Sequence, residues 1–221
     1  SLGFSTFNNM MYMSLTMTSA MNVAIVQASL PFFVFLLNFI IYRLNPTLFQ
    51  IVGFPITVIG VLMITSKGSL EVLQSLTFNM GDLLMIAAIA VYGVYSVFLN
   101  KKPDVHWLSF IAVLASSAFI ISLFYSGYEV ATDTAIWPDL TGTLIVFYTA
   151  IFPSILSQVF WIRSVELIGS NSSAIWINVV PVFGTLLAIL IVGERFQIFH
   201  GLGMLLIIGG VWIAQRKKTN P

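Results

Sequence analysis

The sequence predicts an all-α membrane protein, a polytopic helix bundle with inverted repeats, with eight transmembrane helices present of an expected ten. Three observations support this fold class. Of the 221 residues, 58% are hydrophobic and only 8% are charged, against about 25% charged in soluble domains. The apolar runs approach the ~20 residues that a helix needs to cross a bilayer, and they lack the alternation of β-barrel strands. Finally, one long stretch of the chain occurs twice.

Short polar breaks separate the apolar runs and set the limits of the expected helices. The charged residues are concentrated in these breaks. We expect membrane-spanning helices at residues 2–20, 22–43, 48–66, 82–100, 107–128, 143–163, 172–193 and 197–215.

The duplicated stretch covers residues 22–66 and recurs without a gap at residues 172–216, 150 positions later. Matched apolar residues carry little information in a chain of this composition. Matched prolines and glycines carry more, because each marks a requirement of the backbone. The matches of this kind are Pro31 with Pro181, Gly53 with Gly203, and Gly60 with Gly210.

The basic residues indicate the orientation of the chain, because cytoplasmic loops are enriched in Lys and Arg. If the C-terminus is placed in the cytoplasm, seven of the nine basic residues fall on that side and only Lys67 and Arg195 fall outside. The seven are Arg43, Lys101, Lys102, Arg163, Arg216, Lys217 and Lys218.

The number of crossings makes the repeat an inverted one. The chain crosses the membrane five times from helix 22–43 to its copy at 172–193, so the copies point in opposite directions. Inverted repeats are typical of alternating-access transporters. The second half has five expected helices and the first only three, so we expect a piece of a ten-helix protein. A natural eight-helix variant is the alternative.

The residues of the repeat resemble the drug/metabolite transporter superfamily and, within it, the EamA family. The matching motifs of the second copy are Ala174-x6-Pro181, Leu186-Leu187, Gly193-Glu194-Arg195, Gly201-x-Gly203 and Gly209-Gly210-Val211. The first copy keeps Ala24-x6-Pro31 and Gly53-x6-Gly60-Val61, but Arg43-Leu44-Asn45 replaces the Gly-Glu-Arg end.

This resemblance implies a carrier of small organic solutes, often exported, with a central cavity between two five-helix repeats. It implies that residues 1–68 form the C-terminal three helices of the first EamA-like repeat. Residues 82–218 would form the complete five-helix second repeat. The substrate does not follow from the resemblance, because one fold can serve many substrates.

Polar and aromatic residues at membrane depth are the candidate substrate-binding residues, because such groups are costly unless they face protein or a cavity. Amides and phenols offer hydrogen bonds without fixed charge, and aromatic rings can hold cations. This chemistry suits a neutral, zwitterionic or cationic organic solute. The candidates are Asn8, Asn9, Tyr12, Gln27, Tyr92, Ser96, Gln158, Trp161, Trp176 and Asn178.

A structural interpretation stands beside each candidate. Intramembrane Asn and Gln often join helices to each other, at about 1 kcal/mol. Gln27 and Trp176 lie about one turn before Pro31 and Pro181, where a proline can bend a helix. These bends serve either as hinges beside the substrate or as plain kinks.

Other residues are expected to have structural roles. The glycine pairs Gly53/Gly60 and Gly203/Gly210 are each seven apart, so we expect them to allow close packing within each repeat. Glu194 lies in a tight turn, where holding the loop is favoured over gating. No acidic or basic residue falls near the membrane midplane, so proton coupling through a buried carboxylate has no support within these residues; the two further helices expected could hold one. The lack of a central Lys or Arg also argues against phosphorylated substrates.

The sequence therefore predicts a secondary transporter, an exporter working by alternating access, in the cell membrane as a multi-pass protein with a cytoplasmic C-terminus. Its expected partners are a small-molecule substrate and the lipid bilayer, with no nucleic acid; a homodimer stays open. No cofactor and no metal site are expected: there is no cysteine, and His106 and His200 appear isolated in loops. The sequence does not contain the group of catalytic residues that a membrane-embedded enzyme would need. A non-transporting scaffold or receptor-like component is the alternative.

Overall fold

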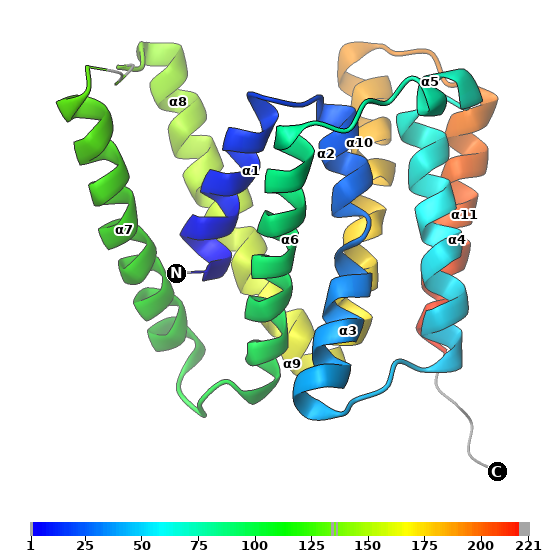
Figure 1. The fold of residues 1–221 in the computed structure, drawn as a ribbon, viewed down its shortest axis with the longest axis horizontal. Coiled ribbons are helices and arrows are strands. Elements are labelled where there is room, and N and C mark those ends of the chain that lie inside the picture. The colour runs from blue at the N-terminus through cyan, green and yellow to red at the C-terminus, as the bar shows by residue number, and fades with distance from the viewer. Residues whose placement is uncertain (1, 134, 136, 217–221) are drawn as a thin grey trace.

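The computed structural model describes residues 2–133, 135 and 137–216. Its helices cross one common slab, most of them steeply, and short connections join them at either end (Figure 1). The π- and 3-10-helical segments are η1 Leu2–Thr6, η2 Leu99–Lys101, η3 Ala150–Leu156, η4 Ile177–Val179 and η5 Ala188–Val192. The α-helices are α1 Phe7–Leu15, α2 Ala20–Gln27, α3 Leu30–Tyr42, α4 Leu48–Thr65, α5 Leu70–Gln74, α6 Met80–Phe98, α7 Trp107–Ala131, α8 Leu140–Thr149, α9 Ser157–Trp176, α10 Val180–Leu187 and α11 Ile198–Ala214.

Five helical segments are long and apolar enough to cross a membrane by length and composition. They are Ala20–Tyr42, Leu48–Thr65, Met80–Lys101, Trp107–Ala131 and Leu140–Val192. The last of these is 53 residues long and consists of two passes that meet at Gly169. Together with the shorter Leu2–Leu15 segment and α11, the described residues make the eight passes that the sequence predicts.

Local sequence signals set several helix ends. Thr47 and Gln50 form a reciprocal capping box at the start of α4, and Asn79 and Asp82 form one at the start of α6. Each box satisfies backbone N–H groups that have no partner within the helix. Gly193 ends the segment η5 in a left-handed conformation, which glycine adopts without steric penalty.

Two connections differ from the sequence prediction. The expected break at residues 164–171 is wrong in extent, because helix continues on both sides of Gly169, a single residue with φ 80° and ψ 158°. This backbone conformation is open to glycine and strained for other residues. The expected loop between Lys67 and Gly81 contains the short helix α5, which Ser69 caps by accepting from the N–H of Val72.

The two passes that carry the repeated prolines Pro31 and Pro181 are interrupted at equivalent places. In the first copy, α2 ends at Gln27 and α3 begins at Leu30, with Pro31 in its first turn. In the second copy, α9 ends at Trp176, the turn η4 follows, and α10 begins at Val180 with Pro181 in its first turn. Proline removes one helical hydrogen bond and clashes with the preceding turn, which favours a new helix start.

The most extensive contact between two helices of the described residues is that of α4 and α11, which lie side by side at one edge of the bundle (Figure 1). Gly53 and Gly60 of α4 face Gly210 and Gly203 of α11, respectively. A Cβ added to Gly60 would lie 2.7 Å from the carbonyl oxygen of Gly203. The expectation of packing within each repeat is therefore wrong: these glycines join one copy to the other. Their seven-residue spacing defines a helix face but not the partner of that face.

The same contact reveals the symmetry of the molecule. Gly53 and Gly203 are equivalent residues of the repeat, as are Gly60 and Gly210. Gly53 meets Gly210, and Gly60 meets Gly203, so exchanging the two copies turns one contact into the other. A contact that is unchanged by this exchange is isologous, the mark of a two-fold axis. The α4 and α11 helices are therefore antiparallel, as an inverted repeat requires.

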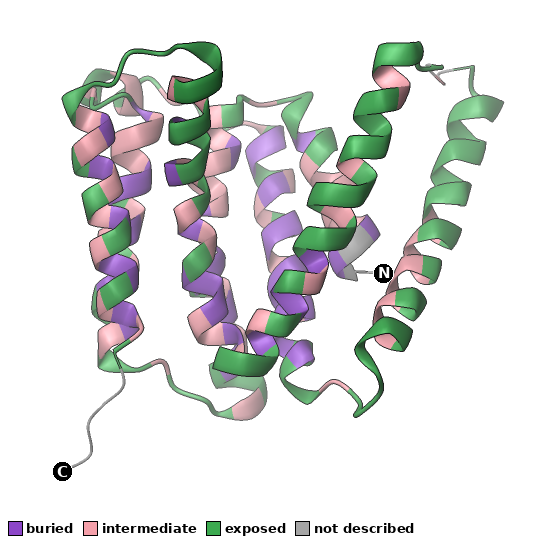
Figure 2. Ribbon diagram, turned by 180° about the vertical axis from the view of Figure 1, so that it is seen from behind, coloured by how far each residue is buried: buried purple, intermediate pink, exposed green. Residues whose placement is uncertain are grey.

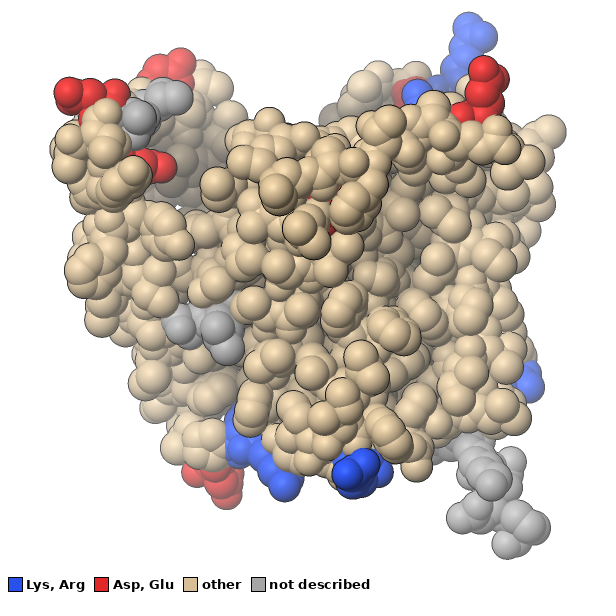
Figure 3. Space-filling model, in the orientation of Figure 1, with Lys and Arg blue, Asp and Glu red and all other residues tan. Residues whose placement is uncertain are grey.

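Burial and charge agree with a membrane setting. The buried residues concentrate on the central helices, while α7 and much of α8 are exposed (Figure 2), and within α7 no residue is buried. Exposed apolar helices suit contact with lipid tails. Acidic and basic side chains gather at the two ends of the molecule and leave an uncharged belt between them (Figure 3).

Candidate functional site

Four aromatic rings meet between α1, α6 and α9, and we name this group the aromatic cluster: Phe7, Tyr92, Tyr95 and Trp161. The ring of Tyr92 is central, with centroid distances of 4.7 Å to Phe7, 5.5 Å to Tyr95 and 5.4 Å to Trp161. Tyr92, Tyr95 and Trp161 are each at least nine-tenths buried. Rings at these separations form favourable tilted contacts.

Gln158 connects the cluster to the first residues of the chain. Its Oε1 accepts a hydrogen bond from the Tyr95 hydroxyl at 3.3 Å, and its Nε2 donates to the Gly3 carbonyl at 3.4 Å. Gly3 lies against the face of Tyr95, where any added Cβ would collide with the ring. The glycine thereby allows the N-terminal turn to cover Tyr95.

One polar atom of the cluster has no partner. The indole Nε1 of Trp161 is buried and makes no hydrogen bond with any described residue. An unsatisfied buried donor costs about 1–3 kcal/mol, so it is unusual in a stable core. The aromatic cluster and the neighbouring Gln158 therefore combine flat apolar surface, an amide and one available donor, without a charged side chain among them.

A second group lies at the two helix breaks. Asn178 is 1% exposed, and its Nδ2 donates to Thr57 Oγ1 at 2.8 Å and to the Ala28 carbonyl at 3.4 Å. Ala28 and Asn178 are equivalent residues of the repeat. Gln27 lines a small cavity together with Asn178. The hydrogen bond from Asn178 to the Ala28 carbonyl therefore links the break in one copy to the break in the other.

The structure brings some predicted site residues together and leaves others apart. Tyr92, Gln158 and Trp161 meet in the aromatic cluster, and buried Ser96 donates to the Tyr92 carbonyl of the same helix. Gln27 and Asn178 meet at the helix breaks. Asn8 and Asn9 are half-buried on α1, where Asn9 donates to Ser5. Tyr12 and Trp176 are 55% and 48% exposed, outside both groups.

Sequence reasoning did not select Phe7, Tyr95 and Thr57 as site residues. Tyr95 lies three residues after Tyr92 and shares its helix face, which is a signal that the sequence does contain. Thr57 lies between Gly53 and Gly60 on α4, so the small-residue face could have pointed to it. Phe7 gave no signal, because aromatic residues are common along the whole chain.

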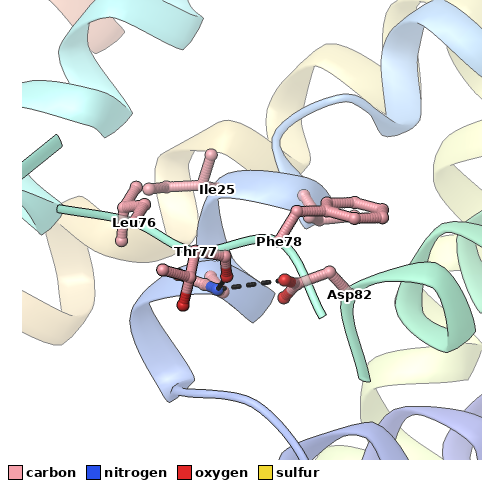
Figure 4. Close-up of a pocket in the computed structure, with 7 residues that line it drawn as sticks. Ile25, Leu76, Thr77, Phe78 and Asp82 are labelled. Atoms are coloured by element: carbon pink, nitrogen blue, oxygen red, sulfur yellow. Dashed lines mark hydrogen bonds between the residues drawn. The ribbon is translucent and has the colours of Figure 1, made fainter. Parts of the chain in front are cut away.

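A buried carboxylate lies at the start of α6. Asp82 is 2% exposed and accepts from the Thr18 hydroxyl at 2.6 Å, the Asn22 amide at 3.2 Å and the Asn79 N–H at 2.9 Å. It lines a pocket of about 220 Å³ beside Ile25 and the segment Leu76–Phe78 (Figure 4). Asp82 completes the capping box at the start of α6, where a negative charge close to the helix N-terminus is favourable. It also fastens the turn between α1 and α2 to α6.

Amides and hydroxyls form a network at the opposite end of α6. Asn38 is 1% exposed; it donates to Ser170 and Asn171 at 2.7 Å and 2.6 Å and accepts from Asn100 at 2.9 Å. Nearby, Glu166 pairs with Lys102 at 2.9 Å and with Arg163 at 2.8 Å. Arg163 and Glu166 lie three residues apart on α9, a spacing at which opposite charges on a helix can pair, and Lys102 is a further partner.

His200 corrects one expectation. It was placed in a loop, but it lies in the first turn of α11, is 5% exposed, and its Nδ1 accepts from the Gln197 N–H. This hydrogen bond to the N-cap backbone is the half of a capping box that His200 supplies, and the rings of Phe196 and Phe199 lie 5.9 Å and 4.1 Å from its imidazole. Within the described residues, no group of three His, Cys, Asp or Glu side chains could hold a metal ion.

Comparison with known proteins agrees with this architecture. The model of the EamA-like transporter family matches residues 1–66 and 79–215. An uncharacterized transporter of Bacillus subtilis, YyaM, is 25% identical over 220 residues, which cover 96% of this chain and 70% of that protein. An uncharacterized transporter of Archaeoglobus fulgidus is 28% identical over 211 residues, covering 94% of this chain and 71% of that protein. A crystal structure of another protein, 16% identical, superposes with a TM-score of 0.79 over 95% of this chain and 71% of its own.

Proposed function

The chain belongs to the EamA-like transporter family, and from this we propose that it carries small organic solutes by alternating access between its two inverted halves. The observation that supports this most is the isologous contact of α4 and α11, in which Gly53 meets Gly210 and the equivalent residues Gly203 and Gly60 meet in the same way. Inverted halves can adopt each other's conformation, which opens the site to either side in turn.

The aromatic cluster is the proposed solute site. Its rings offer flat surfaces for stacking and for cation–π contact. Gln158 and the unpaired indole N–H of Trp161 can form directed hydrogen bonds. Because none of these side chains carries a fixed charge, the site suits neutral, zwitterionic or cationic solutes. Asn8 and Asn9 of α1 are proposed to join the site when the solute is bound.

The proposed orientation places the end of α3 and the start of α7 in the cytoplasm of a cell-membrane protein. Arg43 at the end of α3, Lys101 and Lys102 after α6, and Arg216 after α11 belong to this end. Their excess supports a cytoplasmic C-terminus, although Lys217 and Lys218 lie outside the described residues. By its family resemblance we propose export as the direction.

The test is transport by the purified complete polypeptide, with both repeats whole, in proteoliposomes, with a panel of radiolabelled neutral, zwitterionic and cationic organic solutes. For a solute that is carried, the variant to test is Trp161→Phe, which keeps an aromatic ring at this position and removes the indole N–H donor. We expect its KM to rise about tenfold, which corresponds to one lost hydrogen bond of about 1.4 kcal/mol.

Trp212→Phe is the matched control, because Trp212 is 61% exposed on α11, away from the cluster. Its KM should stay unchanged. Equal KM values for both variants and the unmodified protein would remove the aromatic cluster as the solute site. Failure of every solute in the panel to be carried would favour the non-transporting scaffold instead.

A further inference from the structure

A small cavity of about 50 Å³ lies where the two broken helices meet. Gln27 and Ala28 line it from the first copy, and their equivalents Ile177 and Asn178 line it from the second. Two pairs of equivalent residues thus surround one space. The volume is enough for a small ion or a few water molecules, because about 10–15 Å³ of such space holds one water.

The prolines leave carbonyl groups without their usual helical donors beside this cavity. Pro31 has no N–H to offer the carbonyl of Gln27, four residues earlier. Pro181 has none for the carbonyl of Ile177, which instead accepts from the Val180 N–H in the turn η4 and keeps its second lone pair. Gln27 and Ile177 both line the cavity. They also lie at the C-terminal ends of helical segments, where the backbone dipole favours a positive charge.

Asn178 supplies a third oxygen, and its hydrogen bonds fix which way the amide faces. The Ala28 carbonyl can only accept, and the Thr57 hydroxyl already donates its proton to the Phe54 carbonyl at 2.7 Å. Both neighbours therefore require the NH₂ group of Asn178. Its Oδ1 is left buried and without a partner among the described residues.

We propose that this cavity binds a small monovalent cation, Na⁺, through Asn178 Oδ1, the carbonyls of Gln27 and Ile177, and the side-chain oxygen of Gln27. Discontinuous helices in transporters provide Na⁺ ligands of this kind from unwound backbone. No acidic, basic or histidine side chain lines the cavity. A proton therefore has no titratable group to bind, and a divalent ion lacks the carboxylates it prefers.

The position of the site suggests its role. A cation that bridges Gln27 and Asn178 stabilises the arrangement in which the breaks of both copies meet, because it interacts with oxygens of each copy at once. A part for this ion in solute movement rests on the proposed transport function. Binding itself does not, and it can be measured without any organic solute.

The experiment measures Na⁺ binding to the purified full chain in detergent. Thermal unfolding is compared in NaCl and in choline chloride at equal ionic strength, and ²²Na⁺ binding is measured directly. At ten times the Kd of the ion, linkage predicts a rise in Tm of about 3–6 °C for a protein of this size. Asn178→Ala and Gln27→Leu should each reduce the ²²Na⁺ affinity at least tenfold and abolish most of the Tm rise.

Asn38→Ala is the matched control, because Asn38 is equally buried but its Oδ1 is already occupied by Asn100. It should lower the basal Tm and keep the full response to Na⁺. Gln27→Leu tests the ligand set even if Asn178→Ala fails to fold. The absence of a Na⁺-specific Tm rise in the unmodified protein, or normal ²²Na⁺ binding by Gln27→Leu, overturns the proposal and leaves a cavity that holds water only.

Discussion

Replacing Gly210 by alanine tests the contact between the two halves most directly. A Cβ at this position would lie 2.7 Å from Cγ2 of Thr57, 2.8 Å from the Gly53 carbonyl oxygen and 2.9 Å from the Thr57 backbone nitrogen. Carbon atoms in favourable contact lie about 3.5–4.0 Å apart. Two of these three atoms belong to the backbone, so α4 and α11 must separate by roughly 1 Å.

Two opposing terms set the expected size of the effect. Alanine in place of glycine inside a helix is favourable by about 1 kcal/mol. Overpacking a close contact costs about 1–3 kcal/mol. The neighbouring residue Gly209 provides the control, because a Cβ there would meet nothing within 4 Å. The helix-propensity gain is the same at both positions, so the difference between the variants isolates the contact.

The assay is thermal unfolding of both variants of the full chain in the same detergent. We expect the Tm of Gly210→Ala to lie about 2–12 °C below that of Gly209→Ala, at roughly 2–4 °C for each kcal/mol. By the two-fold symmetry, Gly60→Ala should lower Tm by a similar amount, because its Cβ would meet Ile207 and Gly203 at 2.7 Å. Equal Tm values for Gly209→Ala and Gly210→Ala would refute the close approach of the helices.

Two further predictions concern charged side chains. Asp82→Asn should lower the free energy of unfolding by about 1–3 kcal/mol, since its new NH₂ group must face one of the three donors that Asp82 now binds. The same change at exposed Asp139, an N-cap that accepts from Gly142, should cost less, and equal losses in Tm would contradict the buried network. Glu166→Gln should lower stability by about 1 kcal/mol, because its partner Arg163 is largely exposed while Lys102 is only partly exposed, and this loss should shrink in 1 M salt. A loss that is independent of salt would mean that the carboxylate contributes through packing.

Much of the fold could be predicted because its determinants are local or periodic. Apolar runs of membrane length marked the passes, and Pro31 and Pro181 marked the places where two of them break. The length of the connection at Gly169 is overestimated by the sequence prediction, because the polar residues around this glycine suggest a loop. Polar residues there instead face Asn38 and Asn100, so burial in a network keeps them helical.

The candidate site was predictable residue by residue but not as an arrangement. Gln158 and Trp161 were selected for their polar groups at membrane depth, yet only the packing of α9 against α6 brings them to Tyr92. Tyr12 satisfied the same criterion and is 55% exposed, because the choice of helix face depends on neighbours that one sequence does not name. The sequence therefore indicated the kind of side chains in the candidate site, whereas helix packing determines which of these side chains meet there.

The rigid and the interrupted parts of the molecule meet at Thr57. This residue lies on α4 between Gly53 and Gly60, in the middle of the contact with α11, and it accepts the hydrogen bond of Asn178 at the second helix break. Separating α4 from α11 would lose close backbone packing that lipid tails cannot replace, since association in the membrane depends on such packing. The breaks beside Pro31 and Pro181 already lack a helical hydrogen bond each, so bending there costs less. In the proposed cycle, the α4–α11 pair therefore stays fixed, and movement takes place at the helix breaks around it.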